Sequence, residues 1–225
     1  MNNELIINLI GTGSALLIIT LIFWFTNLDI YFESFFYNER KGWFLKDHKL
    51  MKFLYKYGRA PGAIVFLISL LILILGLFIP LFARYRKISL YLFLYMFIGS
   101  GIIINSILKI YWGRPRPKQI KKFGGKYDYV NVFMFGKAGR NSSFPCGHAS
   151  IAFYMIFPYF LLKSTNPILA LIFLFIGLLF GLLVGIGRMV QGGHFASDVV
   201  WAGGIMYLTG LILYYLMGLY VGILI

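Results

Sequence analysis

Six long apolar stretches divide the chain, at residues 5–26, 61–83, 88–108, 147–162, 167–187 and 199–221. A helix needs roughly 20 apolar residues to cross a ~30 Å hydrocarbon layer, so each stretch is predicted to span a membrane. The fourth is the shortest and contains Pro158. Because the stretches lack the apolar-polar alternation of membrane β-strands, the sequence predicts an all-α fold: a six-transmembrane-helix bundle forming one polytopic membrane domain over residues 1–225.

The connections between these helices differ in length. Residues 84–87 and 163–166 form tight turns, whereas 27–60 and 109–146 are long segments. In an alternating topology the long segments share one side of the membrane, so we expect the chemistry there, with 109–146 as the catalytic-side loop. Segment 27–60 mixes aromatic and basic residues, which favours a helix in the headgroup zone that acts as an interfacial anchor or as a lid for a lipid.

Composition supports a membrane protein. Hydrophobic residues make up 60% of the chain and charged residues 12%, and the mean hydropathy is +0.82. That profile excludes an ordinary soluble domain. The net charge of +14 is interpreted as loops that face anionic membrane lipids, with no nucleic-acid partner. The single cysteine, Cys146, excludes an intramolecular disulfide and a multi-cysteine zinc site. The first stretch has no obvious cleavage site, so we expect a retained helix.

Three polar clusters lie at the ends of apolar stretches, where ionisable side chains are costly unless they face a polar cavity. The first begins at Lys109, at the exit of the third helix, and includes Arg114 and Arg116, each followed by proline. Proline restricts the preceding residue and holds both arginines in extended geometry. Guanidinium groups and lysine bind phosphate oxygens, so this cluster predicts a phosphate site, with a basic interfacial anchor as the alternative.

The second cluster, residues 142–150, is at the entrance of the fourth helix. Pro145 and Gly147 favour a helix start, where backbone N–H groups at Cys146 and Gly147 and the helix dipole attract an anion. His148 stands beside that anion position and is a candidate proton donor to a leaving oxygen. The alternative for His148 is a solvated histidine at the membrane boundary.

The third cluster, residues 187–198, links the fifth and sixth helices. If residues 194–198 are helical, His194 and Asp198 lie on one face, close enough to hydrogen-bond. A carboxylate on one ring nitrogen raises the basicity of the other, which makes His194 a candidate nucleophile; a structural His-Asp pair is the alternative. Arg188 adds a cation, and alternating topology places all three clusters on one membrane face.

The three clusters together form a spaced pattern. Lys109 is followed after six residues by Arg116-Pro117, then by the run 145–148, then by Arg188, five residues, His194, three residues and Asp198. This pattern resembles the type 2 phosphatidic acid phosphatase family. The resemblance covers about residues 109–198.

The resemblance implies a metal-independent phosphoric monoester hydrolase that acts on a phosphorylated lipid without a cofactor. His194 would attack phosphorus to give a phosphohistidine, Asp198 would orient it, and His148 would protonate the leaving group. The phosphoryl oxygens would be held by Lys109, Arg116 and Arg188, with Arg114, Cys146 and Gly147 also in the phosphate site.

The chain departs from the family pattern at Cys146 and at Gly187, where the family usually has serine. We expect these changes to tune activity and not to abolish it. Segments 35–45, 123–125 and 144–150 are similar to those of bacterial lipid A phosphatases, which predicts lipid A as the substrate. Undecaprenyl pyrophosphate or phosphatidylglycerophosphate is the alternative substrate, and an anion or lipid transporter is the non-enzymatic alternative.

The distribution of Lys and Arg bears on orientation. More basic residues lie on the catalytic side, so the positive-inside rule alone would place the site in the cytoplasm. Several of these cations are needed for phosphate or anionic lipid. The resemblance favours the bacterial inner membrane, a periplasmic site and cytoplasmic termini.

Overall fold

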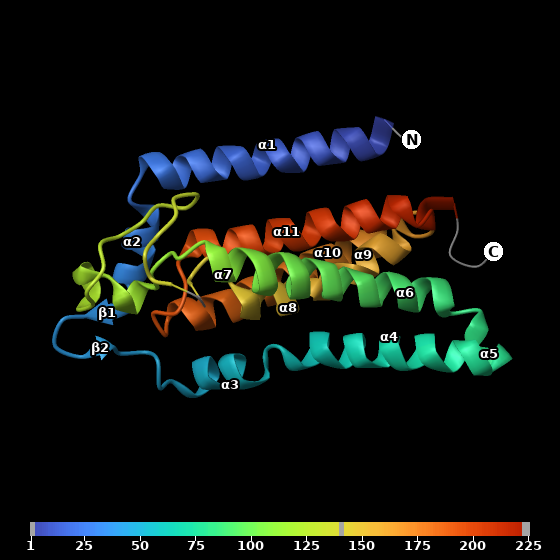
Figure 1. Cartoon of the computed structure of the whole chain (residues 1–225), viewed down its shortest axis with the longest axis horizontal. Coiled ribbons are helices and arrows are strands. Elements are labelled where there is room, and N and C mark those ends of the chain that lie inside the picture. The colour runs from blue at the N-terminus through green and yellow to red at the C-terminus, as the bar shows by residue number, and fades with distance from the viewer. Residues whose placement is uncertain (1–2, 140–141, 222–225) are drawn as a thin grey trace.

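The computed structural model describes residues 3–139 and 142–221, and it is a bundle of long helices (Figure 1). Within these ranges, 5 helices are long and apolar enough to cross a membrane: Asn3–Phe25, Lys49–Phe78, Arg86–Tyr111, Pro167–Met189 and Ala196–Leu216. A shorter apolar helix covers Gly147–Leu162. The predicted polytopic all-α bundle is therefore confirmed.

Prolines and local geometry set where the helices break. Helix α1 (Asn3–Phe25) is continuous, but α4 (Ala60–Phe78) stops before Pro80, which opens α5 (Pro80–Ala83). The expectation of one helix over 61–83 is thus wrong at its end. The next span runs through α6 (Arg86–Leu94), a π-helical stretch over Tyr95–Leu108 and α7 (Lys109–Tyr111).

The shortest predicted span is also broken. It comprises α8 (Gly147–Phe153), a 3₁₀ turn and α9 (Phe157–Leu162), which has Pro158 in its first turn. Helix α10 (Pro167–Met189) is continuous. Helix α11 (Ala196–Leu216) begins before the predicted residue 199 and stops short of 221, with Gly218 at a positive φ of 62° after it.

Segment 27–60 folds into several short elements. It contains α2 (Leu28–Ser34), an antiparallel pair of β1 (Tyr37–Asn38) with β2 (Gly42–Trp43), and α3 (Lys49–Tyr57). In the register Tyr37 lies opposite Trp43. The single interfacial helix expected from the aromatic and basic pattern is therefore replaced by two helices and a hairpin.

Glycines let the central helices approach closely. Helix α11 is the most buried of the 5 long apolar helices in the described ranges. A Cβ at Gly181 of α10 would lie 2.1 Å from the ring of Phe153 on α8, and one at Gly185 would lie 2.3 Å from Val199 on α11. Small residues are the usual means of close helix packing in membranes.

The outer faces of the bundle are apolar. Ile7 of α1, Leu67 of α4 and Phe175 of α10 are 68%, 61% and 68% exposed. Large exposed apolar side chains over whole helix faces are typical of contact with lipid tails.

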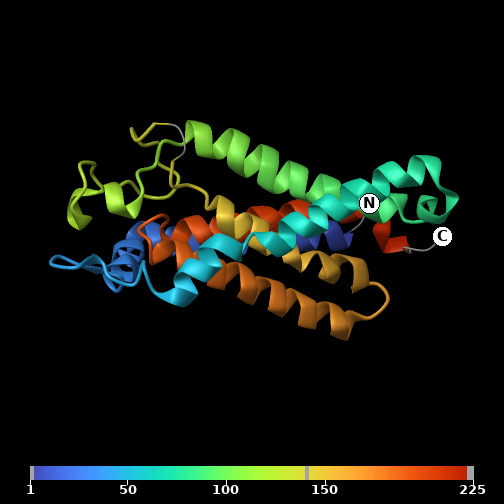
Figure 2. The same cartoon turned by 90° about the horizontal axis from the view of Figure 1, so that it is seen from below.

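The two ends of the bundle differ. Both views place the described ends of the chain and the short turns at one end, and α2, the hairpin and the long loop at the other (Figures 1 and 2). The predicted separation of short and long connections is confirmed. All three polar clusters lie at the end with the long segments, which we call the loop end.

Candidate active site

The three polar clusters meet where α7 ends and α8 and α11 begin. A Cβ at Gly147 would lie 3.2 Å from Lys109 Nζ, so the lysine lies against the start of α8. A Cβ at Gly193 would lie 2.7 Å from Arg188 Nη2, so this guanidinium lies against the residue before His194. The helices thus bring together Lys109 and Arg188, which are 79 positions apart in sequence.

His194 is buried and oriented by a backbone carbonyl. Its Nδ1 lies 2.6 Å from the carbonyl oxygen of Ser143 and 3.7 Å from Oδ2 of Asp198. Nδ1–H therefore donates to the carbonyl, and Nε2 carries the lone pair. The expected direct hydrogen bond from His194 to Asp198 is wrong in detail, because residue 194 precedes α11 and the ring turns toward Ser143.

Ser143 connects the histidine to the carboxylate. Its carbonyl accepts from His194, and its hydroxyl donates to Oδ2 of Asp198 at 2.5 Å. The same carboxylate oxygen accepts from the backbone N–H of Phe195 at 2.8 Å. Ser143 was not predicted as a site residue, although it lies in the 142–150 cluster directly before Phe144-Pro145.

The environment keeps the His194 imidazole uncharged. Burial is the main cause that lowers its pKa, the charges of Lys109 and Arg188 add to it, and Asp198 opposes it, with the pKa at about 3. At neutral pH the ring is therefore neutral and Nε2 is available as a nucleophile.

Tyr55 of α3 joins the second histidine to an arginine. Its ring stacks on His148 with centroids 5.2 Å apart and planes 12° apart, and the Arg188 guanidinium carbon lies 4.7 Å from the same ring. His148 Nε2 and Arg188 Nε are both buried without a protein hydrogen-bond partner in the described part of the chain. Buried polar atoms normally have a partner, so these two are suited to an external acceptor such as a phosphoryl oxygen.

A cationic cavity opens beside these groups. It has a volume of about 380 Å³ and is lined by Tyr55, Arg116, Arg188, Lys46, Asp47, Lys52, Lys118 and Gln191. Arg116 and Arg188 thus share one cavity, as the sequence analysis predicted. Among the described residues, no three His, Cys, Asp or Glu side chains are grouped as metal ligands would be.

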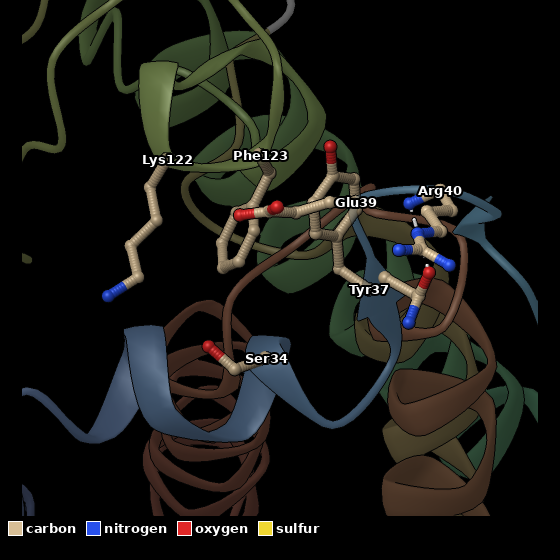
Figure 3. A pocket seen from close by; sticks show the side chains of 7 residues that line it. Ser34, Tyr37, Glu39, Arg40, Lys122 and Phe123 are labelled. Atoms are coloured by element: carbon tan, nitrogen blue, oxygen red, sulfur yellow. Dashed lines mark hydrogen bonds between the residues drawn. The ribbon is translucent and has the colours of Figure 1, made fainter.

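A larger hollow of about 520 Å³ lies beside the hairpin and contains none of the predicted site residues. The rings of Tyr37 and Phe123 pack together there, 5.2 Å apart, with Arg40 and Lys122 at its edges (Figure 3). We therefore assign the candidate active site to the smaller cavity, which adjoins Tyr55 and Arg188.

Arg114 is not a phosphate ligand. Its side chain is completely buried, and its guanidinium donates to the Val130 carbonyl, the Ser197 hydroxyl, Asp198, Asp29 and the Tyr129 hydroxyl. All three nitrogens are thus engaged within the protein. The prediction that Arg114 binds phosphate is wrong, because a carboxylate on α2 and one on α11 take its donors.

The backbone N–H of Cys146 is not available to bind phosphate, because it donates to the carbonyl oxygen of Asp198 at 3.1 Å. Its thiol is buried, and burial raises the pKa of that thiol although Lys109 and Arg188 lower it. A thiolate nucleophile is therefore disfavoured. Gly147 begins α8 and lies beside Lys109, and its place in the phosphate site stays a prediction.

The Cys146→Ser variant is expected to keep kcat/KM within about fivefold of the wild type, since the change is small and the thiol does no chemistry. N-ethylmaleimide is expected to leave the wild-type protein active. Phosphate release from a lipid phosphate, with and without the reagent, measures both results. Inactivation by the reagent that the serine variant escapes would show that the thiol is part of the site.

The chain is similar to known proteins over most of its length. The model of the PAP2 superfamily matches residues 89–220. Lipid A 4'-phosphatase of Francisella tularensis subsp. novicida is 34% identical over 196 residues, which cover 86% of this chain and 87% of that protein. Lipid A 4'-phosphatase of Rhizobium etli is 33% identical over 125 residues, covering 52% of this chain and 46% of that protein.

The chain is also similar to a phosphatase with a different name. Phosphatidylglycerophosphatase B of Bacillus subtilis is 31% identical over 162 residues, covering 69% of this chain and 68% of that protein. No solved structure gives a significant match. The family match over residues 89–220, with a relative similar over most of both chains, makes this protein a member of the PAP2 superfamily.

Proposed function

We propose that this protein is a lipid A phosphatase that hydrolyses the 4′-phosphate monoester through a phosphohistidine on His194. The observation that carries the proposal is the position of His194: it is buried and neutral, and its Nδ1–H is donated to Ser143, which leaves Nε2 as the nucleophile. Lys109 and Arg188 lie close enough to lower its pKa, so the same place suits an anion.

In the first step, Nε2 of His194 attacks phosphorus, and the bond from phosphorus to the sugar oxygen breaks. With the phosphate dianion bound beside it, His148 would enter this step as the imidazolium, and its Nε2–H, which has no protein partner, would give its proton to the leaving oxygen. In the second step, water attacks the phosphohistidine and gives its proton back to His148. Inorganic phosphate leaves, and both imidazoles return to their starting state.

The cations stabilise the charge on the transferred group. Lys109, Arg116 and Arg188 would hold the three phosphoryl oxygens, in the role that metal ions have in other phosphoryl transfers. We expect orthovanadate, which mimics the trigonal-bipyramidal phosphorus, to inhibit hydrolysis. We also expect EDTA to leave the rate unchanged. A rate lost on chelation and restored by a divalent cation would contradict the proposed mechanism.

The surroundings of α3 suit a lipid. Lys52 and Tyr55 line the cationic cavity, whereas Phe53 and Tyr57 line an apolar groove of about 360 Å³ between α3, α4 and α10. The groove is lined almost entirely by apolar atoms, with Ile64 of α4 and Phe180 of α10 on its far side. A phosphate group in the cavity and an acyl chain in the groove would therefore lie on opposite sides of α3.

Relatives support the choice of lipid A. Three of the matched relatives carry the name lipid A 4'-phosphatase, and one carries the name phosphatidylglycerophosphatase B. The second candidate substrate is therefore phosphatidylglycerophosphate, with undecaprenyl pyrophosphate as a third.

The substrate is tested with purified protein in detergent, given each of the three lipids at equal concentration. We expect the highest kcat/KM for lipid A, with loss of one phosphate from the 4′ position by mass spectrometry. A higher kcat/KM for phosphatidylglycerophosphate would replace the proposed substrate and keep the chemistry. Uptake of a phosphorylated lipid into vesicles without phosphate release would favour a transporter.

We further propose the bacterial inner membrane as the location, with the loop end in the periplasm. The described chain ends and the short turns lie at the end of the bundle opposite the site, so a periplasmic site goes with cytoplasmic chain ends (Figure 1). The test uses Cys146→Ser carrying a new cysteine at Lys122 or at Arg84, two exposed positions at opposite ends. A membrane-impermeant maleimide should label only Lys122→Cys in spheroplasts; labelling of Arg84→Cys alone would place the site in the cytoplasm.

A further inference from the structure

A buried charge cluster lies behind the proposed nucleophile. Arg114 donates to Oδ1 of Asp198 at 2.5 Å and to Oδ2 of Asp29 at 2.7 Å, and all three side chains are completely buried. Burial opposes the guanidinium charge, but Asp198 and Asp29 raise the pKa of Arg114 above its usual value. The arginine is therefore charged and shared by two carboxylates.

Asp29 comes from a part of the chain that the sequence analysis did not connect with the site. It lies on α2, before the region 89–220 that matches the family. Besides Arg114, it accepts from the Ser197 backbone N–H at 2.9 Å, the Ser197 hydroxyl at 2.6 Å and the Tyr129 hydroxyl at 3.1 Å. Four hydrogen bonds to one buried carboxylate fix both Arg114 and the first turn of α11.

The sharing of Arg114 changes the charge that His194 faces. Two carboxylates and one guanidinium give the cluster a net charge of −1. With Asp198 alone, the guanidinium would neutralise the carboxylate that lies 3.7 Å from His194 Nδ1. When Nε2 bonds to phosphorus, the imidazole becomes positively charged. A cluster with net negative charge stabilises that cation, and a neutral one does so less.

We propose that Asp29 is a positioning residue of the proposed phosphatase, which holds Arg114 and the start of α11 so that Asp198 keeps its place and its negative charge toward His194. The inference rests on the proposed function. It assigns α2, outside the family-matched region, an indirect part in the reaction, through Arg114 and Asp198.

The test compares Asp29→Asn with Glu33→Gln. Glu33 lies on the same short helix and is equally buried, but neither of its carboxyl oxygens has a protein hydrogen-bond partner in the described ranges. Burial and the charges of Asp29 and Asp198 raise the pKa of Glu33 well above its usual value, which favours its neutral form. Glu33→Gln is therefore a matched acid-to-amide change that removes no charge.

Single-turnover hydrolysis of lipid A, with enzyme in excess, separates positioning from folding. For Asp29→Asn we expect a rate constant about 10- to 100-fold lower, the usual cost of losing a partner of a reacting group, with KM in steady state unchanged. The amplitude should equal that of the wild type. Glu33→Gln should have wild-type rate constant and amplitude.

Each outcome decides the inference. A wild-type rate constant for Asp29→Asn, or a lower amplitude with an unchanged rate constant, would overturn it, because the residue would then be structural. An equal loss in Glu33→Gln would also overturn it. His194→Ala is measured in the same assay: if it keeps activity, the proposed function fails, whereas a dead His194→Ala beside a fully active Asp29→Asn removes only the inference.

Discussion

His194→Ala is expected to lower kcat/KM for lipid A by about 10⁴-fold or more, because it removes the atom that bonds to phosphorus. The cations and His148 would stay in place, but water would then have to attack the phosphate directly. Binding of the substrate should change little, since Lys109, Arg116 and Arg188 hold the phosphoryl group. Phosphate release under saturating and limiting substrate measures kcat and KM separately.

The third histidine supplies the control. His48 precedes α3, is exposed and does not line the cationic cavity. His48→Ala should therefore keep the wild-type kcat/KM, and both variants should elute as the wild type does in size-exclusion chromatography. Full activity of a folded His194→Ala would mean that another group is the nucleophile.

Arg114→Met is expected to destabilise the protein by about 3–5 kcal/mol, the largest effect on stability that we predict. The change leaves two buried carboxylates, Asp29 and Asp198, without the guanidinium that both contact. The measurement is thermal unfolding in detergent, read together with the yield of folded protein from membranes.

Arg116→Met is the matched comparison, two residues along the chain. Arg116 is half-buried and lines the cationic cavity. We expect its substitution to keep the unfolding temperature near that of the wild type and to lower kcat/KM about 10²- to 10³-fold, as loss of one transition-state donor does. An Arg114→Met protein with wild-type stability and reduced phosphate binding would instead support the original prediction that Arg114 is a phosphate ligand.

Arg114 and Arg116 have different surroundings in the structure, and the sequence did not predict this difference. Both precede a proline in the same short run; the spaced pattern includes Arg116, but nothing in the sequence shows what Arg114 contacts. The difference comes from Asp29, which is 85 residues from Arg114 and reaches it only in the folded bundle. A local motif carries no information about such a distant partner.

The pairing of His194 with Asp198 was predicted more completely. The spacing of His194 and Asp198 predicted that they lie together, and in the structure Nδ1 of His194 is 3.7 Å from Oδ2 of Asp198. The carbonyl of Ser143 as the partner of Nδ1 was missed, because a backbone acceptor has no signature in the sequence. Tyr55 was also missed as a wall of the site: aromatic residues are common throughout 27–60, and only folding shows which one meets His148.

The fold was predicted where hydropathy decides it. Apolar length predicted the long spans and the shorter fourth helix, because lipid requires long runs of apolar residues. The break before Pro80 and the π-helical stretch over Tyr95–Leu108 were not predicted, since they depend on local backbone geometry inside apolar sequence. The hairpin over Tyr37–Trp43 was not predicted, because the composition of segment 27–60 indicated a helix.

Trapping the covalent intermediate tests the central claim most directly. Lipid A labelled with ³²P at the 4′-phosphate is mixed with enzyme and quenched within the first turnover. We predict protein-bound label that is stable in base, labile in acid, and located by mass spectrometry on His194. Label on a different residue, or turnover with no labelled protein at any quench time in the wild type and in His148→Ala, would contradict the proposed mechanism.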